Sequence, residues 1–472
     1  MKTRTVSGRL APWLAAAGLA LPVTSLAAGF AITEENATGL GSAYSDTATG
    51  NGNASGMFFN PATMSDLPGT QISGGMIYID PKFKLKDGKS SVAGIGDITN
   101  GGDGGNAGVA APVPNLFITH QLNARTHVGF GISVPYGLST DYSSGWLGRY
   151  HAIKSEVQVI NLNPALSFDA NPNLSLGVGL DIQYANANLT SAIDSGSLCY
   201  GAASAGQVPG GTSTCQTYGL TPGNASKDGK VRVKGNDWAL GWNAGLLWHV
   251  NPSTKIGLSY RSAVDHKLKG SVDYSNIPLL LASNPQLADT NARASLDLPA
   301  TANLGISHAF SPRWTMTAGL LWTQWSRFHE LRVTKDNGQP DIVTTEGWKD
   351  TLRYAVGASY KQNSRLTLRS DAGARCAAPH RASARQRPHL ALAGRRLPRY
   401  QEEHGRRRLH PHLVQQREDQ QHDRGYLQEH PDRHLYRLGR HGRRAVQPPF
   451  LSLAGHSSVS FRRRLQALSA FG

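Results

Sequence analysis

Few residues of this chain have the types and the spacing that catalysis requires. A hydrolytic triad needs a Ser and a His held together with an orienting Asp or Asn. Residues 1–370 contain seven histidines, none beside a nucleophile motif: His120, His127, His151, His249, His266, His308 and His329. We therefore expect that the protein is not an enzyme, with a lipolytic enzyme as the alternative from the catalytic class. We also expect no cofactor and no bound metal.

The second chemical feature is a basic C-terminal tail. Residues 371–472 hold 20 Arg, 10 His and no Lys, and they supply +12 of the formal charge of +16. Clustered cations of this kind are typical of an arm that binds polyanions, or of a disordered basic segment. The first 370 residues carry only +4, so the main body is nearly neutral and gives no reason to expect a nucleic-acid partner.

The N-terminus has the pattern of an export signal. Cations precede the apolar run "LAPWLAAAGLA", and "SLA" gives the small residues of a cleavage site, so residues 1–27 read as a signal peptide. The apolar run is too short for the alternative, a membrane anchor. An exported protein enters an oxidising compartment, where disulfides can form. Cys199 and Cys215 flank a Gly/Ser/Thr-rich loop there, and they are either bonded or free.

From about residue 70 the chain repeats one kind of segment, in which apolar and polar residues alternate over ten or more positions. Examples are "ISGGMIYIDPKFKL", "NLSLGVGLDIQYANANL" and "DWALGWNAGLLWHV". This period indicates strands with one apolar face. We count about eleven strands within residues 70–370, the last cut off at "LTLRS". Soluble sandwich strands are usually shorter, about five or six residues.

The connections favour a transmembrane antiparallel β-barrel, an all-β fold. Short turns such as "HVNPSTK" alternate with long loops at 194–230 and 272–292, and Trp and Tyr residues gather near strand ends. Both features are typical of outer-membrane barrels. Residues 28–69 lack the alternation and are too few for a separate domain. We expect them to form a helical hatch, or plug, inside the barrel, which argues against an open general porin.

Several motifs of the chain resemble the FadL long-chain fatty-acid transporters of the Gram-negative outer membrane. The resemblance rests on "AGFAITEENATGLGSAYS", "YIDPKFKL", "VPYGLSTDY", "GNDWALGWNAGLLWHV", "LSYRSAV" and "TQWSRFHELRVT", and it covers residues 28 to about 370 in order. It implies a monomeric 14-stranded barrel with an N-terminal hatch. Ligand would bind in an outer groove and a hatch pocket, and would leave sideways into the bilayer.

The resemblance also implies roles for individual residues. Phe30 either touches ligand or belongs to the core of the plug. Asn60, Pro61 and Ala62 shape a turn of the hatch. Pro135 and Gly137 would kink the third strand and open a lateral gate, since proline lacks a ladder donor. Arg332 either pairs with a ligand carboxylate or with carboxylates of the protein.

The same resemblance changes the interpretation of the tail. Arginine-rich, lysine-free sequence is what a GC-rich gene gives out of register. Back-translated with suitable codons and read one base later, "HLYRLGRHGRRAVQPPFL" (434–451) gives TYTGSVDMVGAQFNLRF, an alternating strand ending in Phe, and a stop codon can follow. We predict a frameshift near residue 370, which would leave this chain unable to assemble or transport.

For the protein encoded without the frameshift, we expect uptake of hydrophobic compounds across the outer membrane. Long-chain fatty acids are the expected ligands, because Arg332 favours a carboxylate, and aromatic hydrocarbons are the alternative. Other hydrophobic small molecules, outer-membrane lipid and lipopolysaccharide are the remaining expected partners.

Overall fold

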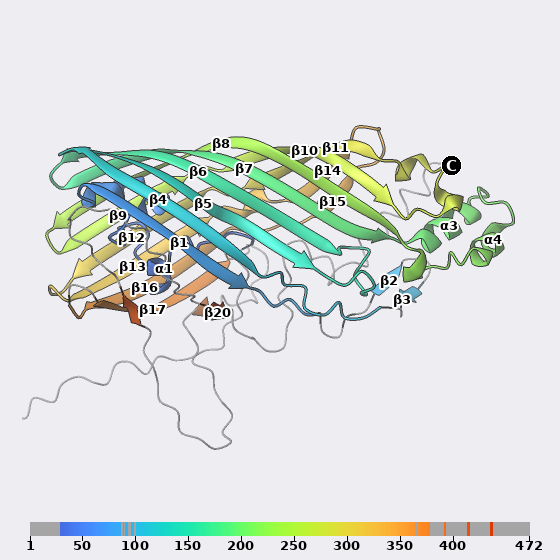
Figure 1. The fold of residues 1–472 in the computed structure, drawn as a ribbon, viewed down its shortest axis with the longest axis horizontal. Coiled ribbons are helices and arrows are strands. Elements are labelled where there is room, and N and C mark those ends of the chain that lie inside the picture. Colours follow the sequence, from blue (N-terminus) through green and yellow to red (C-terminus); the bar gives the residue numbers. More distant parts are fainter. Residues whose placement is uncertain are drawn as a thin grey trace, which may run out of the picture.

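The structure is a computed structural model that describes residues 29–85, 88, 90–92, 96–98, 101–363 and 366–377. It also describes three short segments, at 391–392, 413–415 and 435–437. The expected signal peptide at 1–27 and most of the tail at 371–472 lie outside these residues. Figure 1 shows long tilted strands that run along the molecule and curve around the N-terminal segment.

Fifteen strand segments form the wall of the molecule. In chain order they are β1 (Thr70–Asp80), β4 (Ala111–Asn123), β5 (Thr126–Asp141), β6 (Lys154–Asn171), β7 (Leu174–Ile193), β8 (Gly229–Asn251), β9 (Thr254–Arg261), β10 (Val264–Ser275), β11 (Thr290–Leu298), β12 (Thr301–Ala309), β13 (Trp314–Thr323), β14 (Glu330–Lys335), β15 (Ile342–Thr345), β16 (Thr351–Lys361) and β17 (Leu366–Ala377). All pair antiparallel with their neighbours. A separate hairpin joins β2 (Ser90–Val92) to β3 (Gly96–Ile98).

Four pairs of these segments are halves of single interrupted strands. Strand β8 pairs with both β9 and β10, and β9 and β10 in turn pair with β12 and β11. In the same way, β12 and β11 pair with β13 and β14, which pair in turn with β16 and β15. Each of the pairs β9 and β10, β11 and β12, β13 and β14, and β15 and β16 is therefore one strand with an interruption. The segments therefore make eleven up-and-down strands, as the alternation predicts. The eleventh, β17, continues past the expected boundary at residue 370 and pairs with β16 as far as Ala377.

The ladder does not close within the described residues. The far side of β17 bonds only to β18 (Ala391–Leu392) and β19 (Leu413–Gln415), and the far side of β1 only to β20 (Leu435–Arg437). These three segments hold two or three residues each. The described sheet is thus eleven strands of the fourteen that the resemblance implies.

The outer face of the sheet is apolar and ringed by aromatic side chains. Trp238, Leu240 and Trp242 follow one another on the outside of β8 and are 61%, 67% and 51% exposed. Outward aromatic residues pair across strands, with ring centroids 5.1 Å apart for Tyr184 and Trp238. An apolar band between aromatic girdles is the surface that a barrel presents to lipid. No helix in the described ranges is long and apolar enough to span a bilayer.

The N-terminal segment, residues 29–69, packs against the inner face of this sheet. It forms α1 (Ala37–Leu40), α2 (Gly56–Phe59) and the 3-10 helix η1 (Pro61–Asp66). Strand glycines allow the close approach: a Cβ atom on Gly177 would collide with the backbone of Ala62, and one on Gly257 with the backbone of Ala48. Glycine is required at these positions because backbone meets backbone there.

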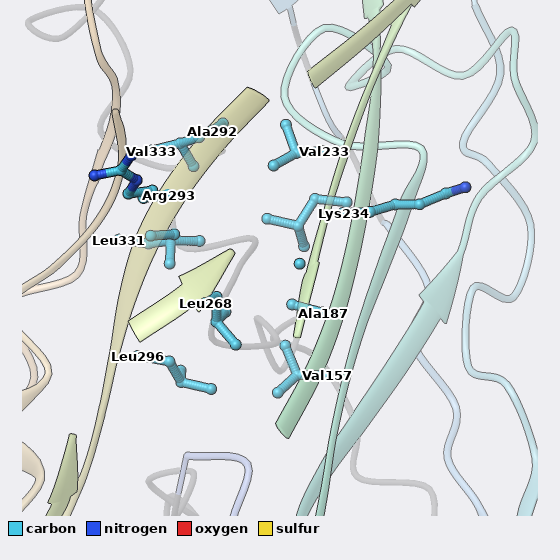
Figure 2. Close-up of a pocket in the computed structure, with 13 residues that line it drawn as sticks. Val157, Ala187, Val233, Lys234, Leu268, Ala292, Arg293, Leu296, Leu331 and Val333 are labelled. Carbon is cyan, nitrogen blue, oxygen red and sulfur yellow. The ribbon is translucent and has the colours of Figure 1, made fainter. Parts of the chain in front are cut away.

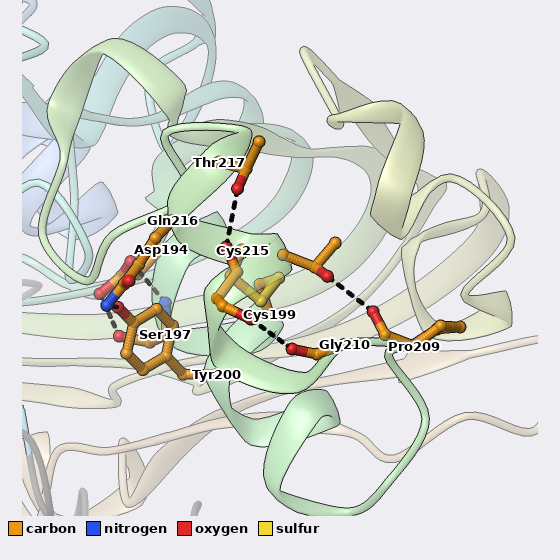
Figure 3. The surroundings of a disulfide bond; sticks show 11 residues. Asp194, Ser197, Cys199, Tyr200, Pro209, Gly210, Cys215, Gln216 and Thr217 are labelled. Atoms are coloured by element: carbon orange, nitrogen blue, oxygen red, sulfur yellow. Dashed lines mark hydrogen bonds between the residues drawn. A yellow bond between two sulfur atoms is a disulfide. The ribbon is translucent and has the colours of Figure 1, made fainter.

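The long loops at the opposite rim carry α3 (Ser195–Ser204), α4 (Gly211–Thr217), η2 (Ala225–Lys227), η3 (Leu279–Leu281) and η4 (Pro285–Leu287). One further 3-10 helix, η5 (Trp325–Arg327), lies at the interruption between β13 and β14. A disulfide between Cys199 and Cys215, whose Cα atoms are 6.0 Å apart, joins α3 to α4 (Figure 3). Both cysteines are buried in an apolar cluster with Leu220 and Leu281, so the loops between β7 and β8 and between β10 and β11 form one cap. Long loops mark the extracellular side.

Candidate ligand-binding cavity

An apolar cavity lies inside the sheet, on the extracellular side of the N-terminal segment. It is narrow, with a cavity volume of about 20 Å³. Inward side chains of six strands line it: Val157 (β6), Ala187 and Leu189 (β7), Val233 (β8), Leu268 (β10), Ala292, Ala294 and Leu296 (β11), and Leu331 and Val333 (β14). In Figure 2 the labelled aliphatic side chains point toward one another, while Lys234 and Arg293 point away. A lining of this composition suits an apolar ligand.

A cluster of aromatic rings adjoins the cavity, and Phe30 is at its centre. The centroid of the Phe30 ring lies 5.2 Å from the ring centroid of Trp325, 5.8 Å from those of Phe328 and Trp348, and 5.9 Å from that of Tyr136. All four ring pairs are edge-on. Phe30 is only 2% exposed. The same packed cluster includes the cavity residues Val157, Leu268, Leu296 and Leu331. The structure therefore places Phe30 in a packed apolar core that is continuous with the cavity wall.

The ladder between β4 and β5 stops halfway. Its last pair is Leu116 with Ile132, and the register of β5 shifts between Ser133 and Tyr136, around Pro135. The N-terminal segment occupies the gap. Ile32 N–H donates to the Pro135 carbonyl at 2.8 Å, and Gly137 N–H donates to the Phe30 carbonyl at 2.9 Å. The irregularity thus falls where Pro135 and Gly137 predict a kink, and the residues beside Phe30 satisfy the backbone there.

The Asn60-Pro61-Ala62 motif fixes the other end of the segment. Asn60 is fully buried and caps η1 by accepting from Ala62 N–H at 3.0 Å, with Pro61 in the first helical turn. Its amide donates to the carbonyl of Ala48 at 2.7 Å and to that of Leu246 on β8 at 3.0 Å. The motif therefore fastens the segment both to itself and to the wall.

A buried polar network supports the segment from β7 and β9. The Arg261 guanidinium donates to Asp181 and to the Phe58 carbonyl, and it lies 4.4 Å from the centroid of the Phe58 ring. Asp181 also accepts from the amides of Asn161 and Asn243, at 2.9 and 3.0 Å. Each buried charge has an opposite partner, which is the condition for tolerating it.

Glu35 is an acidic residue of the N-terminal segment whose carboxyl group lacks a hydrogen-bond partner among the described residues. It is fully buried. Burial raises the pKa of the Glu35 carboxyl to about 8, against the opposing effect of Arg261 and with a smaller contribution from Glu34. Glu35 is therefore mostly protonated at neutral pH. Sequence reasoning missed this residue, because nothing in "AITEEN" marks it as buried.

Arg332 does not face the cavity, which corrects the expectation that it contacts the ligand. On β14 it is exposed on the outer face and pairs with Glu330 at 2.7 Å and Asp341 at 2.9 Å. Its neighbours Leu331 and Val333 line the cavity instead. The next inward residue of that strand is Lys335, which is 9% exposed and lies opposite Ala292, another lining residue.

Lys335 is the cation at the outer end of the cavity. No carboxylate lies within ion-pairing distance of its ammonium group among the described residues. The alternation of "LRVTK" could have identified it, because Leu331, Val333 and Lys335 share one face of the strand.

Two of the histidines lie beside carboxylates. His249 contacts Asp66 at 2.9 Å, and His266 lies 3.4 Å from Asp237. Within the described ranges, no serine hydroxyl hydrogen-bonds either ring. A Ser-His-Asp arrangement is thus not assembled around these two rings.

The fold and the cavity define the class of protein: an outer-membrane β-barrel that transports hydrophobic compounds. Residues 18–376 match the family described as outer membrane protein transport protein (OMPP1/FadL/TodX). The chain belongs to this family, and its place is the outer membrane of Gram-negative bacteria.

Individual relatives agree with this assignment. A long-chain fatty acid transport protein of Escherichia coli O6:H1 is 31% identical over 372 residues, covering 76% of this chain and 79% of that protein. The structure of a Pseudomonas aeruginosa FadL homologue is similar, with a TM-score of 0.66 at 26% identity over 75% of this chain and 83% of that one. The Ralstonia pickettii toluene transporter TbuX shares the fold, with a TM-score of 0.50 at 21% identity over 70% and 86% of the two chains.

The burial of Glu35 predicts a pH-dependent stability. An acid whose folded pKa exceeds its unfolded value stabilises the fold below the unfolded pKa, and this contribution is lost as pH rises through the folded pKa. The relevant window runs from 4.5 to about 8. We expect Glu35→Gln to raise the melting temperature at pH 8.5 and to leave it unchanged at pH 4.5, as measured by circular dichroism in detergent.

Glu34→Gln is the matched control for this experiment. We expect it to raise the melting temperature at pH 8.5 by less than Glu35→Gln does, because Glu34 makes only a smaller contribution to the pKa of Glu35. An equal change of melting temperature for Glu35→Gln at pH 4.5 and 8.5 would contradict the assignment.

Proposed function

We propose that this protein takes up long-chain fatty acids through the cavity described above. The observation that carries the proposal is the continuity of an apolar cavity with the Phe30 cluster, which itself lies at the interrupted edge of β5. The similarity to a long-chain fatty acid transport protein supports the same ligand class. The hydrophobic effect would drive an acyl chain from water into such a lining.

Lys335 is a suitable partner for the carboxylate end of the ligand. Lys335 follows Val333 on the inner face of β14, so an acyl chain lying between Leu268 and Leu331 would bring its carboxylate toward this ammonium group. A hydrogen bond between two charged groups is worth about 1.5–3 kcal/mol. Arg332 is already paired on the outer face and takes no part.

The exit that we propose is lateral, at the gap between β4 and β5. Residues 29–69 would act as the hatch. Two backbone hydrogen bonds, from Ile32 to Pro135 and from Gly137 to Phe30, hold the segment in the gap. A ligand that displaced the Phe30 ring from its cluster would weaken both bonds. Moving residues 30–32 inward would then leave an opening toward the hydrocarbon of the membrane, where an apolar ligand is stable.

Aromatic hydrocarbons are the second candidate ligands. The observation that favours them is the group of rings around Phe30, since aromatic ligands pair well with edge-on rings. A neutral hydrocarbon would need no partner at Lys335, which gives a means of telling the two ligand classes apart.

Filling the cavity tests the proposed function. Leu268→Trp adds bulk at the centre of the lining, so we expect oleate to bind at least tenfold more weakly, as measured by fluorescence displacement on purified protein. Leu240→Trp is the matched control, because this side chain is 67% exposed on the lipid-facing side. Unchanged oleate affinity in a folded Leu268→Trp protein would disprove binding at this cavity.

The ligand class is tested at Lys335. We expect Lys335→Met to weaken oleate binding about tenfold or more, because the carboxylate loses its charged partner. Toluene binding should be unchanged. Arg332→Met serves as the control and should alter neither ligand. If Lys335→Met leaves oleate affinity intact, the carboxylate is held elsewhere; if only toluene binds, the aromatic alternative is correct.

We also propose that residues beyond about 370 are read out of frame. The described sheet ends with an eleventh strand whose far side bonds only to segments of two or three residues. Resequencing the gene should restore one base and reveal three further alternating strands. An in-register reading through residue 472 in the native locus would refute the frameshift. The binding experiments above are therefore made on both the 472-residue chain and the frame-restored chain.

A further inference from the structure

The outer wall carries a group of cations beyond the aromatic girdle on the extracellular side. We call it the outer basic patch; it consists of Arg232 and Lys234 on β8, Lys267 and Lys269 on β10, and Arg293 on β11. All five side chains are exposed on the outward face of their strands. Lys234 and Arg293 border the cavity, but their side chains point away from it, whereas the neighbouring Val233 and Leu268 point inward (Figure 2).

The register of the sheet makes these residues neighbours. Lys269 pairs directly with Arg293, and on its other side it pairs with Asn236, which puts Lys234 on the diagonal. Directly opposed side chains have Cβ atoms roughly 5 Å apart, and diagonal ones roughly 7 Å. Lys269 is therefore the centre of the patch, with a cation on each side.

Like charges that face each other across strands are unfavourable, and the protein compensates them only in part. Arg293 lies 3.5 Å from Asp336, Asp273 pairs across the ladder with Arg232, and the Asp237 carboxylate accepts from the backbone of Lys267. Neither Lys234 nor Lys269 has a carboxylate partner within the described ranges. An external anion would relieve the repulsion that remains.

The position of the patch relative to the aromatic girdle indicates which kind of anion it can meet. Lys234 is four residues beyond Trp238 on β8, and at about 3.3 Å per residue and the usual strand tilt it lies roughly 10 Å above that girdle ring. This is the depth of lipid headgroups, not of bulk solvent. The patch is also bounded: the residues of β7 that pair with Asn236 and Lys234 are the neutral Asn186 and Asn188.

We propose that the outer basic patch binds the phosphate groups of lipid A, the phosphorylated glycolipid anchor of the outer leaflet. Its two phosphates carry negative charge at the membrane surface, where basic clusters recognise anionic headgroups. The lysines present several donors to phosphate oxygens, and Arg293 adds a planar fork. The acyl chains of the same lipid would lie along the apolar wall below, against Trp238 and Leu240. This site is independent of the transport cavity.

The test measures lipid binding to the purified full-length chain, and to its frame-restored form, by native mass spectrometry in detergent. Bisphosphorylated lipid A is the probe, with phosphatidylethanolamine and inorganic phosphate as comparison ligands. We expect the double variant Lys267→Gln, Lys269→Gln to bind lipid A roughly thirtyfold more weakly, given about 1 kcal/mol for each cation near an anionic surface. Binding by the unmodified chain should weaken as salt is raised.

Lys154→Gln is the matched control. Lys154 lies at the extracellular end of β6, is separated from the patch residue Arg232 by strand β7, and pairs with Glu156 at 2.8 Å. We expect this variant to bind lipid A normally. The gel mobility of the folded form, compared with the heated form, confirms that each variant is folded.

Three results would overturn the proposal. They are an equal loss of lipid A binding in Lys154→Gln, equal binding of lipid A and phosphatidylethanolamine, and inorganic phosphate binding as tightly as lipid A. The last would mean that the patch is a general anion site and not a lipid site.

Discussion

No backbone N–H or C=O group can stay unpaired at membrane depth, and the rest of this structure depends on that constraint. Strand β5 violates it locally, because its ladder with β4 stops at Ile132. The chain meets the constraint by bringing residues 30–32 into the gap, where they exchange hydrogen bonds with Pro135 and Gly137. A hydrogen-bonding requirement of the wall thereby fixes the start of the N-terminal segment and, with it, the position of Phe30.

The inside of the sheet is divided into two regions with different physical roles. Toward the short turns, charges and amides such as Asp181, Arg261 and Asn60 hold the segment to the wall through paired, buried contacts. Toward the long loops, aliphatic side chains and the rings around Phe30 leave a cavity. The polar region gives rigidity, because breaking a buried pair is costly. The apolar region can exchange side-chain contacts for ligand contacts at little cost.

The outer face and the cavity wall are formed by the same strands. Alternation along β8, β10 and β11 sends aliphatic side chains into the cavity and cations to the membrane surface from adjacent residues of the same strands. A shift of one residue in register would exchange the two sets. The cap above them, joined by the Cys199–Cys215 bridge, ties together the two long loops that lead into these strands.

The sequence alone was enough for the features that depend on local pattern. Period-two alternation predicted eleven strands, turn and loop lengths gave the polarity of the sheet, and proline at residue 135 located the irregularity in β5. Tertiary structure decided what depends on which faces meet. Arg332 was expected at the ligand, but the pleat turns it outward and turns Lys335 inward, and the cavity exists only because side chains from six strands converge. Alternation is a property of one strand, whereas a cavity is a property of the closed space between strands, which no single stretch of sequence encodes.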